Sequence, residues 1–238
     1  IPIYLLTLGF SLTEVFVYYI IYNLVYSLAA IPAAHLDAKI GFKHTIMLAT
    51  PILILFFILL TNIETSGFPL WALGIIVGIH SGLFWTSYHT DFATVSDGKH
   101  LDKEVGFVKF AIKISGVMGP VIGGAIIATF GFNPLLWIVV ILLALSVVPL
   151  FFSKDVHSSS NISIRRAFKG KKVKDWIALA ASGLEDSVAG VLWPIFIFFT
   201  VISSFETVGL VTSVSLVISL MFIIITGKLA DKHRNIVM

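Results

Sequence analysis

Two adjacent carboxylates, Glu185 and Asp186, lie in a stretch of sequence that is otherwise free of charge. Residues 176–201 contain no other Asp or Glu and no Lys or Arg. An ionised carboxylate at the centre of a membrane-embedded helix costs at least about 2.5 kcal/mol, so such a group faces a protein interior or a water-filled cavity, or it takes up a proton. The pair can therefore couple protons or bind a cationic substrate, and structural pairing with Lys113 is the alternative.

The two carboxylates point in different directions if the segment is helical, because adjacent helix positions are about 100° apart. Asp186 shares its face with neighbours that suit a cavity wall, namely Ser182, Gly190 and Trp193. Glu185 shares its face with mainly apolar neighbours, namely Ala181, Val188 and Leu192. An apolar environment disfavours the charged carboxylate, which favours a protonatable role for Glu185.

A single histidine, His80, lies in the middle of a second apolar stretch, residues 69–90, close to Gly78, Gly82 and Trp85. An imidazole titrates near neutral pH, so His80 can relay protons. A buried histidine also serves as a hydrogen-bonded packing residue. The sequence leaves both roles open.

Polar side chains form a stripe on the helix predicted at residues 15–34. The stripe consists of Tyr19, Tyr22, Asn23 and Tyr26, and a later segment carries a similar stripe of Thr212, Ser215 and Ser219. Such side chains line a transport pathway or bond neighbouring helices to one another. Both roles stay open, and Asn23, Tyr26 and Ser215 are the candidates for a cavity wall.

The composition defines the environment in which these residues act. Of the 238 residues, 58% are hydrophobic and 12% are charged, whereas soluble domains average about 25% charged residues. The mean hydropathy is +1.00. This composition requires lipid as the solvent and excludes a disordered, a collagen-like or a nucleic-acid-binding chain. The absence of Cys excludes disulfides and thiolate metal sites.

Seven apolar segments are predicted to be membrane-spanning helices. Each is close to the ~20 residues that a hydrocarbon core requires, and each is continuous rather than alternating, which argues against a β-barrel. The segments are residues 15–34, 45–62, 69–90, 106–130, 134–152, 176–201 and 207–227. We interpret residues 1–10 as the outer end of a preceding helix. The predicted fold class is an all-α membrane protein.

The basic residues lie on one side of the predicted membrane. Fourteen of the sixteen Lys and Arg residues are in the connections 35–44, 91–105 and 153–175 and in the tail from residue 228. The other two, Lys109 and Lys113, lie near the inner end of their span. Because basic connections stay in the cytoplasm, this side is predicted to be inside. The net charge of +3 is then explained without a nucleic-acid partner.

The second helix has a copy later in the chain, at a constant offset. The matching pairs are Ser11 with Ser203, Glu14 with Glu206, Leu24 with Leu216, Val25 with Val217, Ser27 with Ser219, Leu28 with Leu220 and Ile31 with Ile223. The two copies have the same orientation, which is a parallel repeat of the kind that transporters use. Because six helices separate equivalent points, we expect this chain to be about two thirds of a twelve-helix protein.

Short patterns at these positions resemble signatures of a known family. Gly227-Lys-Leu-Ala-Asp231-Lys232 resembles the loop signature of the major facilitator superfamily, Gly-x-Leu-Ala-Asp-Arg/Lys-x-Gly-Arg/Lys. The first copy keeps Leu36, Lys39, Gly41 and Lys43, with Asp37 one position early. Gly119-Pro120-Val-Ile-Gly123-Gly124, with Ser115 at the leading Gly, resembles the glycine pattern of the family's efflux-type exchangers. The resemblance covers the end of helix one through helix eight.

The resemblance implies a six-helix repeat followed by the first two helices of a second repeat. Residues 1–152 would form the N-terminal bundle, residues 153–175 a basic cytoplasmic linker, and residues 176–238 the start of the C-terminal bundle. The residues implied to gate conformational change are Asp37, Lys39, Gly41, Lys43, Gly227, Asp231 and Lys232. A direct role in exchange and close helix packing are both open for Gly119, Pro120, Gly123 and Gly124.

The function that these features favour is secondary transport by alternating access, with the substrate bound between the two bundles. Export of a small organic solute in exchange for protons is the favoured subtype. A facilitator or importer of sugars or metabolites is the alternative, because the family's exchangers often carry an Arg on helix four and this chain has none before Arg165. A non-transporting membrane protein is an alternative from a different functional class. The paired acids Glu185 and Asp186 disfavour it.

The sequence also indicates which partners to expect. No enzyme motif, metal-ligand cluster or cofactor signature occurs, so we expect neither catalysis nor a cofactor. The expected partners are a small-molecule substrate, protons and the lipid bilayer. We expect a monomer in a bacterial-type plasma (inner) membrane.

Overall fold

The long apolar runs form helices because lipid offers no hydrogen-bond partners, so the backbone must satisfy its own donors and acceptors. The structure is a computed structural model that describes the backbone of residues 1–95, 101–153, 172–201 and 203–232, and their side chains except at 93–95, 101–110, 113 and 223–232. No strand occurs in these residues. The helices are α1 (Pro2–Thr7), α2 (Leu12–Ile40), α3 (Phe42–Thr61), α4 (Ile63–Ser66), α5 (Leu70–Val95), α6 (Leu101–Phe130), α7 (Phe132–Phe152), α9 (Val173–Ser187), η1 (Val188–Leu192), α10 (Trp193–Phe196), η2 (Ile197–Val201) and α11 (Phe205–Lys232).

All seven predicted spans are helical. By length and composition, 6 stretches within the described residues can cross a membrane: Leu12–Ile40, Phe42–Thr61, Leu70–Phe92, Phe132–Phe152, Val173–Val201 and Phe205–Phe222. In the remaining span, α6, the described apolar part is the shorter stretch Ile114–Phe130. The predicted all-α membrane fold is confirmed.

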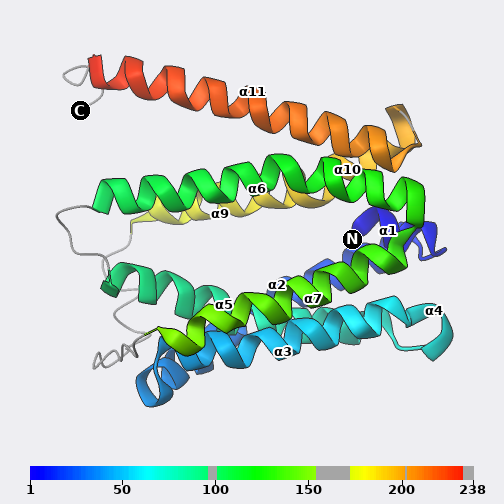
Figure 1. The fold of residues 1–238 in the computed structure, drawn as a ribbon, viewed down its shortest axis with the longest axis horizontal. Coiled ribbons are helices and arrows are strands. Elements are labelled where there is room, and N and C mark those ends of the chain that lie inside the picture. Colours follow the sequence, from blue (N-terminus) through cyan, green and yellow to red (C-terminus); the bar gives the residue numbers. More distant parts are fainter. Residues whose placement is uncertain (96–100, 154–171, 202, 233–238) are drawn as a thin grey trace.

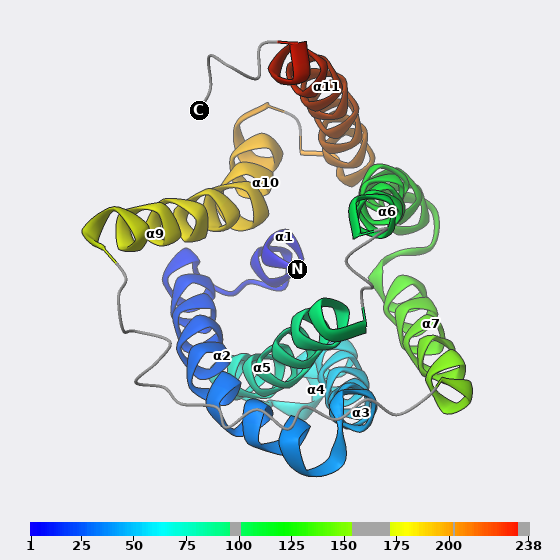
Figure 2. The same ribbon diagram turned by 90° about the vertical axis from the view of Figure 1, so that its left-hand side faces the viewer.

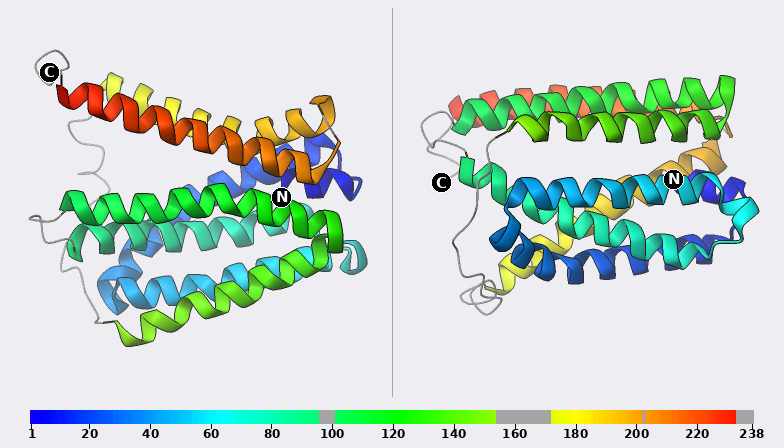
Figure 3. Two further views of the ribbon diagram at one scale, coloured as in Figure 1. Left: turned by 45° about the horizontal axis from the view of Figure 1, so that its top comes forward. Right: turned by 60° about the horizontal axis from the view of Figure 1, so that its bottom comes forward.

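The long helices alternate in direction, so the connections between them gather at two ends of the molecule (Figure 1). We refer to these as the acidic end and the basic end after the charged residues that they contain. The acidic end contains the reversals at Gly9 and Gly131, the short helix α4 and the carboxylates Glu14, Glu64 and Glu206. The basic end contains the reversal at Gly41 with Lys39 and Lys43 beside it. Both views in Figure 3 show the same alternation.

The basic connection predicted at residues 35–44 is not a loop. Helix α2 continues to Ile40, α3 begins at Phe42, and Gly41 alone reverses the chain with φ +86°. Only glycine adopts such a positive φ at little cost, so one residue suffices for the turn. The polar residues around Gly41 resemble a loop in sequence but lie in the last and first turns of two helices.

The span predicted at residues 176–201 is a helix interrupted by π-helical turns rather than a continuous α-helix. The π-helical segments η1 and η2 flank the short helix α10, whose second residue is Pro194. Proline lacks the N–H that would bond to the carbonyl of Gly190, and local π-helical adjustment is one way in which membrane helices satisfy the freed groups. Pro194 therefore accounts for the π-helical segment η1 before it, within a stretch that stays helical from Val173 to Val201.

The most extensive helix contact of the described residues joins α2 to α5 through a glycine stripe. A Cβ added at Gly74 would lie 2.9 Å from the carbonyl oxygen of Tyr18, and one added at Gly78 would lie 2.8 Å from that of Tyr22. At Gly82 it would collide with the Cβ of Ala29. Small residues spaced by four allow two backbones to approach closely in lipid.

The helices are arranged around α1 when the molecule is viewed from the basic end (Figure 2). Helix α5 contacts both α2 and α3, and α3 also contacts α7. Helix α6 contacts α7 on one side and α11 on the other. Helix α11 therefore joins the rest of the structure mainly through α6.

We expect Gly78→Ala to destabilise the protein because the new methyl group must displace the Tyr22 carbonyl or Val25. Overpacking of this kind costs about 1–3 kcal/mol. The measurement is the thermal midpoint of helix loss in detergent. The control is Gly183→Ala in α9, where an added Cβ has no atom within 4 Å. Equal midpoints for the two variants would contradict the close α2–α5 contact.

Candidate functional site

Helices α6 and α11 cross where the predicted glycine pattern lies. A Cβ added at Gly124 would lie 2.9 Å from the carbonyl oxygen of Phe205, and one added at Gly209 would collide with the carbonyl of Pro120. In contrast, a Cβ at Gly119 would have no atom within 4 Å, and one at Gly123 would only touch Leu135 of α7. The packing role is therefore supported for Pro120 and Gly124 but not for the whole pattern.

A hydrogen bond fixes the same crossing. Ser213 of α11 is buried, and its hydroxyl donates to the carbonyl oxygen of Val117 at 2.6 Å. Val117 lies in the turn before Pro120, where the missing proline N–H disturbs the hydrogen bonds of the helix. Pro120 leaves the Gly116 carbonyl without its N–H partner, and the Ser213 bond to the next carbonyl joins the two helices beside this turn.

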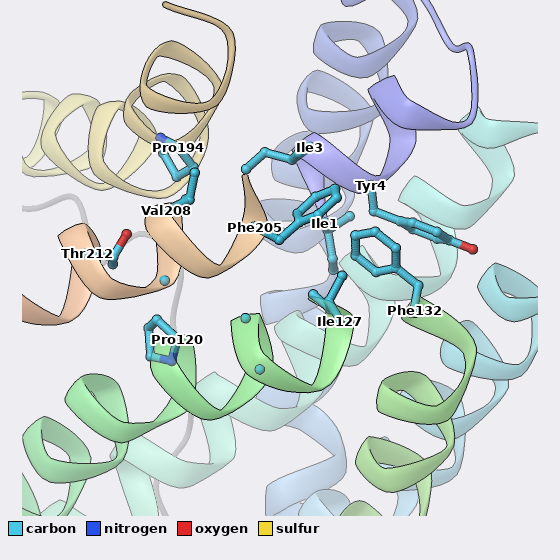
Figure 4. Close-up of a pocket in the computed structure, with 13 residues that line it drawn as sticks. Ile1, Ile3, Tyr4, Pro120, Ile127, Phe132, Pro194, Phe205, Val208 and Thr212 are labelled. Atoms are coloured by element: carbon cyan, nitrogen blue, oxygen red, sulfur yellow. The ribbon is translucent and has the colours of Figure 1, made fainter. Parts of the chain in front are cut away.

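Aromatic rings join four segments at the acidic end, and Figure 4 shows three of these rings, Tyr4, Phe132 and Phe205. Tyr4 of α1 contacts Phe132 of α7 with ring centroids 4.2 Å apart, and Phe132 contacts Phe205 of α11 at 4.9 Å. Phe205 also contacts Phe198 of η2 at 4.8 Å. We refer to these four rings as the aromatic cluster. Ring pairs of this kind add about 0.5–1.5 kcal/mol each beyond the burial of their surface.

A small cavity of ≈ 260 Å³ lies beside the aromatic cluster. Side chains from α1, α6, α7, α10 and α11 line it, including Ile127, Pro194 and Thr212. The lining is almost entirely apolar. The cavity therefore lacks the convergent polar groups that would fix a substrate.

A larger groove of ≈ 960 Å³ runs between α2 and the α9–η1 segment. Its lining residues are Phe16, Tyr19, Ile20, Asn23, Leu24, Ser27, Gly183, Ser187, Val191 and Leu192. This volume is in the range of sites for drug-sized ligands. The groove contains the predicted cavity residue Asn23 and a π-helical turn, and π-bulges frequently occur at functional sites.

The polar side chains of the groove keep hydrogen bonds within their own helices. The amide nitrogen of Asn23 donates to the Tyr19 carbonyl at 2.8 Å, and Ser187 donates to the Gly183 carbonyl at 2.8 Å. Ser27 donates to the Asn23 carbonyl at 2.9 Å. The remaining capacity of these three side chains is the Asn23 carbonyl oxygen, one Asn23 N–H and the hydroxyl lone pairs. At these three side chains a ligand would therefore meet mainly hydrogen-bond acceptors, and Tyr19 adds a phenolic hydroxyl to the lining.

The other predicted cavity residues do not line this groove. Glu185 and Asp186 are exposed, on a helix without a buried residue. Trp193 is also exposed and stacks on Phe196, and Ser215 is exposed on α11. The structure does not bring Glu185, Asp186 and Asn23 together, so the coupling role of the two acids stays a prediction.

Two further predicted residues have local partners instead. His80 is buried, its Nδ1 lies 2.9 Å from the carbonyl oxygen of Ala49 in α3, and its ring stacks on Phe84. The packing role is therefore the one that its surroundings support. The ring of Tyr26 stacks on that of Tyr22, with centroids 6.1 Å apart.

The predicted gating residues around Gly41 differ in their surroundings. Asp37 is buried and accepts a hydrogen bond from the hydroxyl of Ser87 in α5 at 2.6 Å. Lys43 donates to the carbonyl oxygen of Ser153 at 3.0 Å and so connects α3 to the end of α7. Lys39 is exposed.

The gating prediction for the second copy lies outside the described side chains. Gly227, Asp231 and Lys232 are in the last turns of α11, and only their helical backbone is described. Within the described residues, no group of three or more His, Cys, Asp or Glu residues is arranged to hold a metal ion.

Sequence reasoning missed several of the residues that make these contacts. The spacing Gly74, Gly78 and Gly82 was visible as a small-residue stripe and predicts a close helix contact. Gly209 and Ser213 gave no such signal, because their partners lie in the turn of a distant helix that only the fold brings close.

A comparison with protein families identifies the group to which the chain belongs. The family described as Major Facilitator Superfamily matches residues 1–203. No curated protein matches the chain.

We expect Gly209→Ala to weaken the α6–α11 crossing, because its methyl group would meet the Pro120 carbonyl. The expected loss of about 1–3 kcal/mol in the free energy of unfolding exceeds any gain in helix propensity. Thermal unfolding in detergent measures it. Gly119→Ala, on the open side of α6, should be neutral or slightly stabilising. A stable Gly209→Ala variant would show that the two helices do not touch there.

We expect His80→Ala to lower the free energy of unfolding by about 1–3 kcal/mol, because it removes a buried hydrogen bond and a ring contact. His89 on the same helix is exposed, so His89→Ala should change the free energy by less than about 0.5 kcal/mol. Thermal unfolding of both variants measures the difference. Unchanged stability of His80→Ala would reopen the proton-relay role.

Proposed function

Because the chain belongs to the major facilitator superfamily, we propose that it exports a small organic solute in exchange for protons by alternating access. The chain is a multi-pass membrane transporter of this family. The exchange, its direction and the role of each residue are the proposal. Two features of the structure support it: the contacts between helices at the two ends of the bundle, and the groove between α2 and η1.

The observation that carries the proposal is the contact between Phe132 and Phe205 at the acidic end. It joins the starts of α7 and α11, while the same helices diverge toward the basic end (Figures 1 and 3). Phe152 at the end of α7 is exposed, and so is Phe222, the last residue of α11 whose side chain is described. Helices that touch at one end and diverge toward the other are compatible with alternating access.

We assign α1–α7 to the N-terminal bundle, residues 1–152, and the helices after the basic linker 153–175 to the C-terminal bundle. The α6–α11 crossing and the aromatic cluster then lie between the two bundles, and so does the groove between α2 and η1. The one-sided distribution of basic residues supports a cytoplasmic linker. A bacterial-type inner membrane and a monomer are part of the proposal.

In this proposal the groove between α2 and η1 holds the solute, and the acids of α9 carry the protons. Asn23 and Ser187 orient polar groups of the solute, while Phe16 and Leu24 contact its apolar part. Glu185 and Asp186 lie just before the π-helical turn that lines the groove. A change in their protonation can therefore act on the groove through η1.

A facilitator without proton coupling is the second candidate. The residues that line the groove include no acidic or basic side chain, so a neutral solute could bind there without any change in protonation. In this case Glu185 and Asp186 would have no part in the transport cycle.

We expect the double variant Glu185→Gln, Asp186→Asn to abolish transport that is driven by a pH gradient and to leave downhill transport largely intact. Charge removal at both sites eliminates the groups that bind the coupled proton. The assay uses the complete protein in proteoliposomes, with ethidium as the solute probe and an internal pH-sensitive dye. Asp175→Asn, at the basic end of α9, is the matched control.

The outcomes separate the two candidates. Proton movement that depends on ethidium and disappears in the double variant supports exchange. Downhill transport that ignores the pH gradient in both proteins supports the facilitator. If the control loses coupling as fully as the double variant, Glu185 and Asp186 are not the coupling groups.

A further inference from the structure

A separate pocket of ≈ 410 Å³ lies at the acidic end, between the start of α2 and the start of α5. Its lining residues are Phe10, Thr13, Glu14, Val17, Ile63, Gly67, Phe68, Pro69, Leu70 and Trp71. It shares no residue with the groove between α2 and η1 or with the aromatic cluster. The proposed transport function therefore does not explain it.

One carboxylate with spare hydrogen-bonding capacity lines this pocket. Glu14 closes a capping box with Ser11: its Oε2 accepts the Ser11 N–H at 2.8 Å and the Ser11 hydroxyl at 2.7 Å. In the part of the chain that the structure describes, its Oε1 accepts no hydrogen bond. A carboxylate has about four acceptor positions, so Glu14 can receive further donors while the cap stays closed.

Aromatic rings line the same pocket as this exposed carboxylate. Phe10, Phe68 and Trp71 all line the pocket, and Trp71 is 53% exposed. The faces of aromatic rings attract cations, and tryptophan does so most strongly. A pocket lined by one carboxylate and three aromatic rings suits an organic ammonium group, because a carboxylate attracts the charge and the rings can contact the carbon substituents.

The local charge points to the same ligand. The segments that form the pocket, residues 10–17 and 63–71, contain two carboxylates, Glu14 and Glu64, and no Lys, Arg or His. The segments that form the pocket therefore contain no basic residue that could neutralise the charge of Glu14. A cation from outside would be attracted, and an anion would be repelled.

We propose that this pocket between the starts of α2 and α5 binds an organic ammonium group, with Glu14 as its charge partner and Trp71 as its principal ring contact. The ammonium group can belong to a phosphatidylethanolamine headgroup or to a soluble amine. The position suits either source, since the pocket lies at the end of the apolar spans, where an exposed tryptophan marks a membrane interface.

Binding of both sources can be measured on the complete protein. Native mass spectrometry of the detergent-purified protein compares retention of phosphatidylethanolamine and phosphatidylglycerol with identical acyl chains. Calorimetric titration with ethanolamine and with choline tests the soluble source. We expect at least a fivefold preference for the amine lipid over the anionic lipid, or saturable binding of a soluble amine.

The variants separate charge from structure. Glu14→Gln removes the charge but keeps the cap, because glutamine at this position also completes a capping box. We expect it to reduce amine binding at least fivefold, and Trp71→Leu to reduce it severalfold. Glu64→Gln removes a carboxylate at the same end but outside the pocket, so it should weaken binding much less than Glu14→Gln does. Thermal unfolding of each variant verifies its fold.

Each outcome decides the proposal. Glu14-dependent retention of the amine lipid alone assigns the pocket to lipid, and Glu14-dependent binding of ethanolamine or choline assigns it to a solute. Equal retention of the two lipids together with no binding of soluble amines overturns the proposal, as does an equal loss in Glu14→Gln and Glu64→Gln. None of these readouts depends on transport, so failure here leaves the proposed transport function standing.

Discussion

The need to satisfy every backbone hydrogen bond in lipid is the constraint on which this structure depends. Prolines inside the helices violate it, because each leaves the carbonyl four residues earlier without its usual N–H partner. Near Pro51 and Pro120, side chains of other helices contact neighbouring carbonyls: His80 lies beside the Ala49 oxygen, and Ser213 donates to the Val117 oxygen. The α-helical turn that contains Pro194 is flanked by π-helical turns. The contacts of His80 and Ser213 are thus made close to irregular turns of a neighbouring helix.

Close packing in lipid needs small residues, because lipid tails are as apolar as a leucine side chain and water does not drive the helices together. The glycine stripe of α5 and the pair Gly124 and Gly209 meet this need at two different crossings. The first crossing joins α2 and α5 along most of their length and includes three glycines. The second joins α6 and α11 at Gly124, Gly209 and the Val117–Ser213 hydrogen bond, and a Cβ at Gly119 would meet no atom within 4 Å.

The sequence predicted the spans and the two charged ends, because an apolar run of sufficient length permits little but a helix in lipid. It did not predict the turn at Gly41, since polar residues at a helix end resemble those of a loop. The candidate site was less predictable. Asn23 was assigned to a cavity and lines the groove, whereas the partner of His80 depends on how α3 and α5 pack, which periodicity within one helix cannot reveal. The surroundings of Glu185 likewise depend on neighbouring helices.

The two contacts of α11 differ in a way that matters for a transporter of this family. At Gly209 and Ser213 the helix lies against α6 with almost no side-chain material between the backbones, and a hydrogen bond fixes its position. At Phe205 it touches α7 through the edge of a ring. Small residues at a crossing leave little to obstruct a change of angle, while a ring contact at the helix end is lost as soon as the ends separate. In the proposed transport cycle, the α6–α11 crossing is therefore suited to act as a pivot. The Phe132–Phe205 contact is the one that would be lost when α11 turns about this crossing.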